Sequence, residues 1–97
     1  MLTMTDMGLC EYLKEYRRGQ ESAASSRELE AAFHITGVEL RRAVNRLRCS
    51  GYPICSSATG YFYAARPSEI SATIAQLTGR IAKIAAAKNG LLKEPLI

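Results

Sequence analysis

The chain has 97 residues, of which 47% are hydrophobic and 23% are charged, a composition typical of one small globular domain. No stretch approaches the roughly 18 apolar residues of a membrane span, and residues 1–6 lack the regions of a signal peptide. We therefore expect a cytoplasmic protein without a membrane partner. Three cysteines without a C-x-x-C pair and a single histidine disfavour a disulfide framework, a metal site and a catalytic triad. We expect reduced, half-buried thiols, no cofactor and no enzyme activity.

Charge is distributed unevenly along the chain. Residues 1–39 carry seven acidic and four basic residues, a net charge of −3, whereas residues 40–93 carry nine basic residues and one acidic residue, a net charge of +8. A block of one sign attracts polyanions such as nucleic acid. The same pattern also fits a solvated basic surface, so the position of the bases in the fold has to decide between the two interpretations.

The first predicted helix runs from about Asp6 to Arg18, with Thr5 as its N-cap and Gly19 as its stop. One apolar stripe at helical spacing is expected to face the core, and it consists of Leu9, Leu13 and Tyr16. Residues 19–25 form a polar connector that contributes a short strand at most.

Two capping boxes, in residues 25–28 and 36–39, predict two helices that follow one another closely. Only His34 and Ile35 separate them, so the chain must turn sharply there, as it does in a helix-turn-helix. The residues expected in the core are Leu29, Ala32 and Phe33 from the first helix and Leu40, Val44 and Leu47 from the second.

A β-hairpin is predicted directly after the second of these helices. Gly51 and Pro53 end the helix, and two short aromatic or β-branched segments, residues 52–55 and 61–64, flank a turn at Ser56–Gly60. Because side chains alternate along a strand, at least one of the three aromatic residues 61–63 faces away from the core. We expect that residue to contact protein rather than a nucleic-acid base.

The last predicted helix begins at Pro67 and ends near Asn89–Gly90. Apolar residues recur along it at alternating spacings of four and three, which is the pattern of a heptad seam. The seam residues are Ile70, Ile74, Leu77, Ile81 and Ile84. This seam can pack on its own domain, pair with a second copy or receive a different protein.

The predicted fold is mainly α with a small β-hairpin: a winged helix-turn-helix in residues 1–66, a heptad helix in residues 67–90 and a loose tail in residues 91–97. One set of residues carries a resemblance to a known family: Ile35-Thr36, Leu40, Val44, Leu47-Arg48, Gly51, Ile54 and Gly60-Tyr61. Over about 40 of the 97 residues, the chain resembles the N-terminal DNA-binding domain of biotin-repressor-type regulators.

The resemblance implies that the helix beginning at Thr36 enters the major groove of duplex DNA. The residues that would face bases are Gly37, Val38, Arg41, Arg42 and Asn45, and those that would lie near phosphates are Ser26, Arg27 and Thr36. Arg46 extends the same basic cluster, in which arginine can pair with guanine and asparagine with adenine. The chain departs from the family at His34, where glycine is usual, and at the hairpin tip, which carries no lysine or arginine.

We therefore expect sequence-preferring binding of double-stranded DNA by a small transcriptional regulator of bacterial or phage type. DNA readers of this size often bind paired half-sites as dimers, so we expect a homodimer formed through the heptad seam. The alternative is a winged-helix protein-interaction module or assembly adaptor in a larger nucleoprotein complex, which the uncharged hairpin tip favours.

Overall fold

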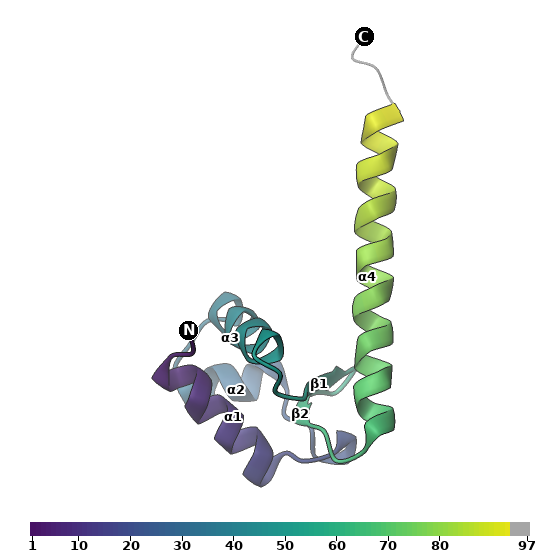
Figure 1. Ribbon diagram of the computed structural model, residues 1–97. Helices are drawn as coiled ribbons and strands as arrows, with labels where there is room; N and C mark the ends of the chain where they lie inside the picture. The colour runs from purple at the N-terminus through teal and green to yellow at the C-terminus, as the bar shows by residue number, and fades with distance from the viewer. Residues whose placement is uncertain (94–97) are drawn as a thin grey trace.

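The computed structural model describes residues 1–93 and consists of helices with one hairpin (Figure 1). The elements are α1 (Met4–Tyr16), the 3₁₀ turn η1 (Gln20–Ser22), α2 (Ser26–Phe33), α3 (Gly37–Cys49), β1 (Ile54–Ser57), β2 (Gly60–Tyr63) and α4 (Pro67–Lys93). The first three helices pack with the hairpin into one body, and α4 projects from this body as a long rod. The predicted fold class, mainly α with a small hairpin and a long C-terminal helix, is confirmed.

Helix α1 begins two residues before the predicted start because Thr3, and not Thr5, is its N-cap, and it ends two residues before the predicted end, with Arg17 as its C-cap. The Thr3 hydroxyl accepts a hydrogen bond from the Asp6 backbone N–H at 3.0 Å, and the Asp6 carboxylate accepts one from the Thr3 N–H at 3.0 Å. Leu9 and Leu13 are fully buried as predicted, but Tyr16 is 71% exposed. The prediction for Tyr16 was wrong because α1 ends at this residue, beyond the edge of the core.

The two capping boxes of the helix-turn-helix are confirmed. Ser25 accepts a hydrogen bond from the Glu28 N–H at 3.1 Å, and Thr36 accepts one from the Glu39 N–H at 3.1 Å. Between the helices, His34 adopts a left-handed conformation with φ of 53° and ψ of 48°. This single left-handed residue ends α2 and redirects the chain into α3.

The core lies where α1, α2 and α3 meet the hairpin. Leu29, Leu40, Val44 and Leu47 are buried as predicted, and Phe33 packs against them while partly exposed. Ala32 is exposed, which corrects the prediction, because the inner face of the short helix α2 follows the i, i+4 pair Leu29 and Phe33.

The hairpin is tighter than predicted. Its strands pair antiparallel with Ser57 opposite Gly60, so the turn consists of two residues only and the predicted five-residue turn was too long. Pro53 precedes β1 instead of lying in it. The connector contributes isolated bridges to the hairpin: Ala24 and Tyr61 exchange two backbone hydrogen bonds, of 2.9 and 2.8 Å. Tyr61 and Tyr63 pack on the main core, and Phe62 is buried on the other face against protein, as expected.

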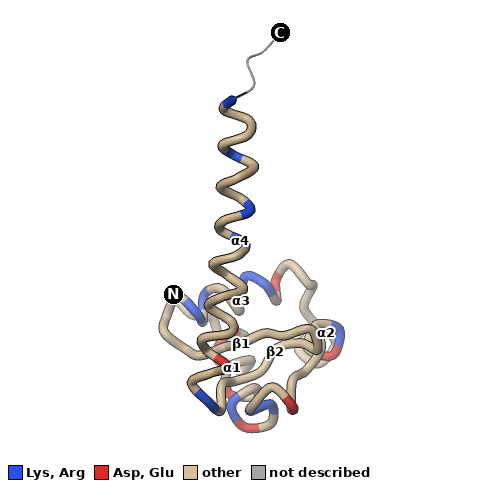
Figure 2. The backbone as a smooth tube through the Cα atoms, turned by 90° about the vertical axis from the view of Figure 1, so that its right-hand side faces the viewer, with Lys and Arg blue, Asp and Glu red and all other residues tan. Residues whose placement is uncertain are grey.

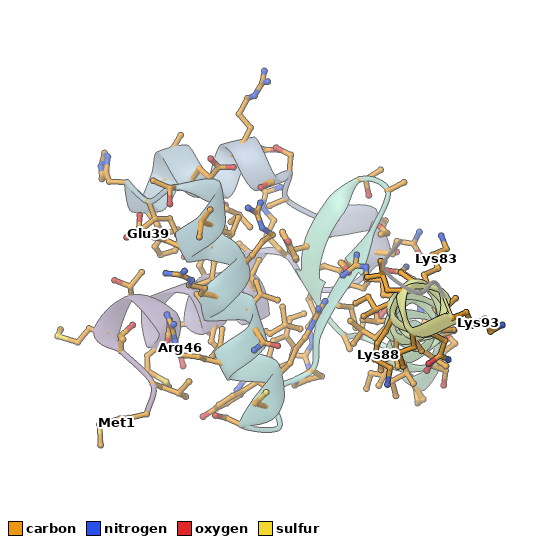
Figure 3. All side chains as sticks on the ribbon, turned by 90° about the horizontal axis from the view of Figure 1, so that it is seen from above. Met1, Glu39, Arg46, Lys83, Lys88 and Lys93 are labelled. Carbon is orange, nitrogen blue, oxygen red and sulfur yellow. The ribbon has the colours of Figure 1, made fainter. Side chains whose placement is uncertain are left out.

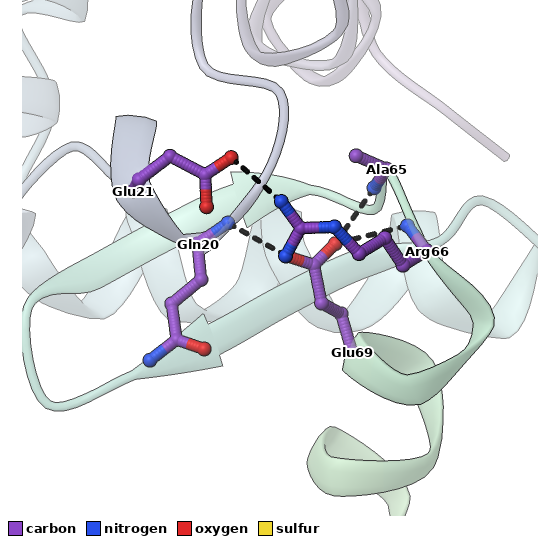
Figure 4. Close-up of polar contacts among 5 residues, drawn as sticks. All are labelled: Gln20, Glu21, Ala65, Arg66 and Glu69. Carbon is purple, nitrogen blue, oxygen red and sulfur yellow. Dashed lines mark hydrogen bonds and ion pairs between the residues drawn. The ribbon is translucent and has the colours of Figure 1, made fainter.

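Helix α4 is anchored at its base by Glu69, which is only 6% exposed (Figure 4). Its carboxylate accepts backbone hydrogen bonds from Gln20 and Ala65, each of 2.8 Å, and from Arg66 at 3.1 Å. The backbone bond from Gln20 is the largest of the influences that lower the pKa of this carboxyl group. Glu69 therefore ties the first turn of α4 to the η1 segment.

The helix continues through Gly90 to Lys93, so the predicted stop at Asn89–Gly90 and the predicted loose tail at residues 91–93 were wrong. A glycine inside a helix costs only about 1 kcal/mol, and the alanines that precede it favour the helix strongly. Residues 94–97 of the predicted tail lie outside the described residues.

Only the base of α4 contacts the body of the protein. Glu69 and Thr73 are buried there, and the Gln76 amide donates a 3.1 Å hydrogen bond to the Ser56 carbonyl. Of the seam residues, Ile74, Ile81 and Ile84 are 57%, 67% and 70% exposed. Packing on its own domain, one of the three alternatives for the seam, is therefore restricted to the first turns of the helix.

Candidate nucleic-acid interface

The outer face of α3 brings together the residues predicted to face bases. Val38 is 47% exposed, and the side chains of Arg41, Arg42 and Asn45 are also exposed, opposite the buried face of the helix. Gly37 lies at the start of this face, where a β-carbon would approach the Arg41 guanidinium and the Glu30 carboxylate. The exposed face therefore presents hydrogen-bond donors and one apolar side chain, with the spacing that the sequence predicted.

The residues predicted to lie near phosphates are less uniform. Arg27 is exposed on α2, and Thr36 has its hydroxyl engaged in the N-cap of α3. The Ser26 hydroxyl donates a 2.9 Å hydrogen bond to the Glu30 carboxylate. An acidic neighbour repels phosphate, so Ser26 is the least favourable of the predicted phosphate contacts.

Arg46 has a partner that sequence reasoning did not foresee. Its guanidinium donates two hydrogen bonds, of 2.7 and 2.9 Å, to the carboxylate of Asp6, whose side chain is fully buried. These bonds lower the pKa of Asp6 to about 2. Figure 3 shows Arg46 on the side of α3 that faces α1. Arg46 thus joins α3 to α1, and we leave it out of the set of base-reading residues.

Arg48 connects α3 to the hairpin. Its Nε donates a 2.8 Å hydrogen bond to the Ile54 carbonyl and its Nη2 a 3.1 Å bond to the Ser56 hydroxyl. Burial lowers the pKa of the guanidinium, and the nearby charge of Arg80 contributes in the same direction. Two guanidinium groups from distant parts of the chain therefore lie near one another.

A groove of about 300 Å³ separates α3 from α4, and we call it the α3–α4 groove. The residues that line it are Arg41, Val44, Asn45, Arg48, Tyr61, Leu77 and Arg80. Arg48, Tyr61 and Arg80 also line a neighbouring hollow of about 330 Å³, which reaches the hydroxyl groups of Ser25 and of the hairpin. Neither lining includes a carboxylate, so both concave surfaces are positively charged.

Arg80 is the residue of this groove that sequence reasoning missed. Arg80 follows Arg48, the previous arginine that lines the groove, by 32 positions in the sequence. It lies between two seam residues of the heptad pattern and is not part of the seam itself. Its single sequence signal was that residues 70–93 contain basic residues and no acidic residue. Figure 2 shows the consequence in space: above the base of α4, all the charged residues of this helix are basic.

The arginines of the described chain fall into two groups. Within residues 1–93, ion pairs hold Arg17, Arg46 and Arg66. Over the same residues, the arginines without an ion-pair partner are Arg18, Arg27, Arg41, Arg42, Arg48 and Arg80. Three of them, Arg41, Arg48 and Arg80, line the α3–α4 groove, whereas Arg42 lines a hollow next to α1 together with Asp6 and Glu39. Uncompensated charge concentrated on one side of a protein attracts an anionic partner.

Other site chemistry is sparse in the part of the chain that the structure describes. No group of three or more His, Cys, Asp or Glu side chains there could hold a metal ion. The cysteines are free as expected, but Cys10 and Cys55 are buried and Cys49 is exposed, so the prediction of half-buried thiols was wrong. Burial raises the pKa of the Cys10 and Cys55 thiols.

Comparisons with protein-family models, with curated proteins and with solved structures give no match for this chain. Among residues 1–93, no helix combines the length and the apolar character that crossing a lipid bilayer requires.

Proposed function

We propose that the protein binds double-stranded DNA with α3 in the major groove and acts as a small dimeric transcriptional regulator of bacterial or phage type. The observation that carries this proposal is that three arginines without ion-pair partners in residues 1–93, namely Arg41, Arg48 and Arg80, line an acid-free groove together with the exposed Asn45. The resemblance to the DNA-binding domain of biotin-repressor-type regulators supports the same proposal.

The side chains of α3 suit direct readout of base edges. Arg41 and Arg42 can each pair two donors with guanine, Asn45 can pair with adenine, and Val38 can contact a thymine methyl group. Phosphate contacts then fall to Arg27 on α2 and to Arg80 across the α3–α4 groove. Arg80 supplies the positive charge that the hairpin tip lacks.

The exposed seam of α4 supports the dimeric part of the proposal. An isolated helix is marginally stable in water, and apolar side chains every third or fourth residue favour a partner helix. A second copy of the chain offers the same seam, and a dimer would present two copies of α3 to two half-sites.

The test is the salt dependence of binding to a labelled duplex, measured by fluorescence anisotropy at several salt concentrations. We expect the Arg41→Ala/Arg42→Ala double variant to bind at least tenfold more weakly and to show a log–log salt slope smaller by up to about 2. The control is Lys14→Ala/Lys93→Ala, which removes the same charge from exposed positions outside the α3–α4 groove. Equal affinities of the two double variants would contradict the assignment of this face.

The second candidate function is that of a protein-interaction module or assembly adaptor. The observations that favour it are the uncharged hairpin turn, Ala58–Thr59, and the exposed apolar seam of the long helix. Binding to duplex DNA that is absent at low salt, in a chain that still folds and associates, would favour this function over the first.

A further inference from the structure

We propose that two copies of the chain pair through α4 in antiparallel orientation, centred near Gly79, with the distal half of each helix seated against the body of the other. This inference rests on the self-association proposed above and not on DNA binding. In heptad notation, the a positions are Ile74, Ile81 and Lys88, and the d positions are Ile70, Leu77, Ile84 and Leu91.

The position of Lys88 distinguishes the two orientations. In a parallel pair, equal positions face one another, so the two Lys88 ammonium groups would meet inside the seam. In an antiparallel pair the order of one helix is reversed, and a positions face d positions. Pairing Ile74 with Ile84 then also pairs Leu77 with Ile81 and places Lys88 beside Ile70 at the end of the seam. The two Lys88 side chains are then about 27 Å apart along the axis, and every other layer of the seam is apolar.

The face of α4 that contacts the body of its own chain also favours the antiparallel pair. The helix contacts its own body through Glu69, Thr73 and Gln76, a face one residue, or about 100° of rotation, from the seam. The twofold axis of an antiparallel pair is perpendicular to both helices, so this flank lies on the same side in both copies. In a parallel pair the axis runs along the helices, and the two bodies would lie on opposite sides.

An apolar groove of about 330 Å³ is present where the antiparallel pair requires one. Tyr52, Pro53 and Ile54 form one wall, and the lower seam residues Ile70, Ile74 and Leu77 form the other. The reversed helix of the second copy would place its Ile84 at the level of Ile74. On the flank next to Tyr52 and Pro53 it would present Ala87, whose small side chain permits close approach.

The antiparallel geometry also spaces the two bodies suitably for paired binding sites. The two Glu69 anchors would be about 30 Å apart along the helix pair, because 20 residues of helix separate their levels. Consecutive half-sites on one face of duplex DNA are about 34 Å apart. The two bodies would therefore be anchored on one side of the dimer, at an axial spacing close to one helical turn of DNA.

Disulfide cross-linking of the full-length chain tests the orientation. Two variants are made in a Cys49→Ser background, because Cys49 is exposed while the other cysteines are buried. One carries Ile74→Cys and the other Ile84→Cys with a size tag. In the antiparallel dimer, equal positions are about 15 Å apart and cannot form a disulfide. We expect a cross-linked product only when the two variants are mixed.

Either variant cross-linking with itself would show a parallel pair and overturn the proposal. A monomeric mass for the unmodified chain, or no product from the mixture, would overturn it as well. These outcomes are independent of DNA binding. If the mixed variants cross-link but the protein does not bind duplex DNA, the antiparallel pair is supported and the proposed DNA binding is wrong. If the protein binds DNA but the mixed variants do not cross-link, only the antiparallel pair is rejected.

A second pair of variants tests the apolar groove. Ala87→Arg places a long charged side chain where the groove of the second copy must close, so we expect at least a tenfold weaker dimer by sedimentation equilibrium. Ala82→Arg is the matched control, since Ala82 lies on the outer face of the helix pair and its substitution is expected to leave the dimer unchanged. Equal effects of the two substitutions would contradict the seating of the distal helix in the groove.

Discussion

At the scale of single residues, the pair formed by Asp6 and Arg46 is central to the packing of α1 on α3. The Asp6 carboxylate is fully buried, and its hydrogen bonds come from the Thr3 backbone and the Arg46 guanidinium. A buried carboxylate is tolerated only when its hydrogen bonds are satisfied. The same aspartate thus completes the capping box of α1 and orients Arg46. One side chain takes part both in a local helix cap and in a long-range ion pair.

This pair predicts a dependence of stability on pH. Because the pKa of Asp6 is lowered from 3.8 to about 2 in the folded protein, its contribution to stability is complete above pH 4 and is lost as the pH falls toward 2. The contribution at neutral pH is at most about 2 kcal/mol, because the Arg46 side chain is 40% exposed and solvent screens its charge. We expect Asp6→Asn to lower the free energy of unfolding by about this amount at pH 7, as measured by urea denaturation.

The control is the same comparison at low pH. At pH 2.5 the difference between Asp6→Asn and the unaltered chain is expected to shrink, because the carboxyl group of the unfolded chain is then protonated. A difference that stays constant from pH 7 to pH 2.5 would show that Asp6 stabilises the protein by packing and not by charge.

At the scale of secondary-structure elements, helix boundaries follow the spacing of capping residues. Both Thr3 and Thr5 can cap α1, but only Thr3 has an acidic residue three positions later to complete the box. The same rule placed the starts of α2 and α3 correctly. The end of α4 is less predictable from such signals. Gly90 does not end this alanine-rich helix, because neither a proline nor a turn follows it immediately.

The seam of α4 predicts a dimer that one substitution can dissociate. Ile81 lies beyond the contacts with the body and is 67% exposed in the single chain. We expect Ile81→Lys to convert the dimer to monomers in sedimentation velocity, because the substitution places a charge in the apolar seam. The control is Ala82→Lys, which adds the same charge to the next residue on the outer face.

The fold of the monomer should survive both of these substitutions, which circular dichroism can verify. If Ile81→Lys retained the mass of a dimer, the seam would not be the contact between copies. The exposed apolar residues would then have to serve a different partner.

At the scale of the whole molecule, charge is arranged by the fold more than by the order of residues. The negative residues 1–39 supply Asp6, Glu21 and Glu28, which are ion-paired with Arg46, Arg66 and Arg17. These pairs neutralise arginines on the body. Of the bases left without an ion pair in residues 1–93, Arg41 and Arg48 on α3 and Arg80 on α4 line the α3–α4 groove.

This arrangement predicts that α4 takes part in DNA binding. We expect Arg80→Ala to reduce the log–log salt slope of duplex binding by about 1 and to weaken binding equally for different sequences, as a phosphate contact should. The control is Lys83→Ala, which removes one charge from the same helix three residues later, outside the lining of the groove.

Fluorescence anisotropy at several salt concentrations measures both slopes. Identical slopes for Arg80→Ala and Lys83→Ala would mean that the charge of α4 acts through long-range attraction alone. Loss of preference for one DNA sequence in Arg80→Ala would instead make this arginine a base-reading residue.

Much of the fold was predictable because its signals are local. Capping boxes, the sharp turn at His34, the helix stop at Gly51 and the aromatic strands of the hairpin all depend on residues a few positions apart. Such interactions form in nearly the same way wherever the segment lies. The set of exposed residues on α3 was predictable for the same reason, since helical spacing alone places them opposite Leu40, Val44 and Leu47.

Tertiary structure alone decided how these elements use their charges and apolar faces. Arg46 has the helical spacing expected of a DNA-reading residue, but its guanidinium is hydrogen-bonded to the carboxylate of Asp6, which lies 40 positions away in the sequence. Arg80 belongs to the candidate interface because α4 stands beside α3, and the seam is exposed because α4 leaves the body after its first turns. The amino-acid sequence by itself determined the helices, the turn and the hairpin, since these need only neighbouring residues. Which arginines remain available, and which helix face needs a partner, follow from distances that exist only after folding.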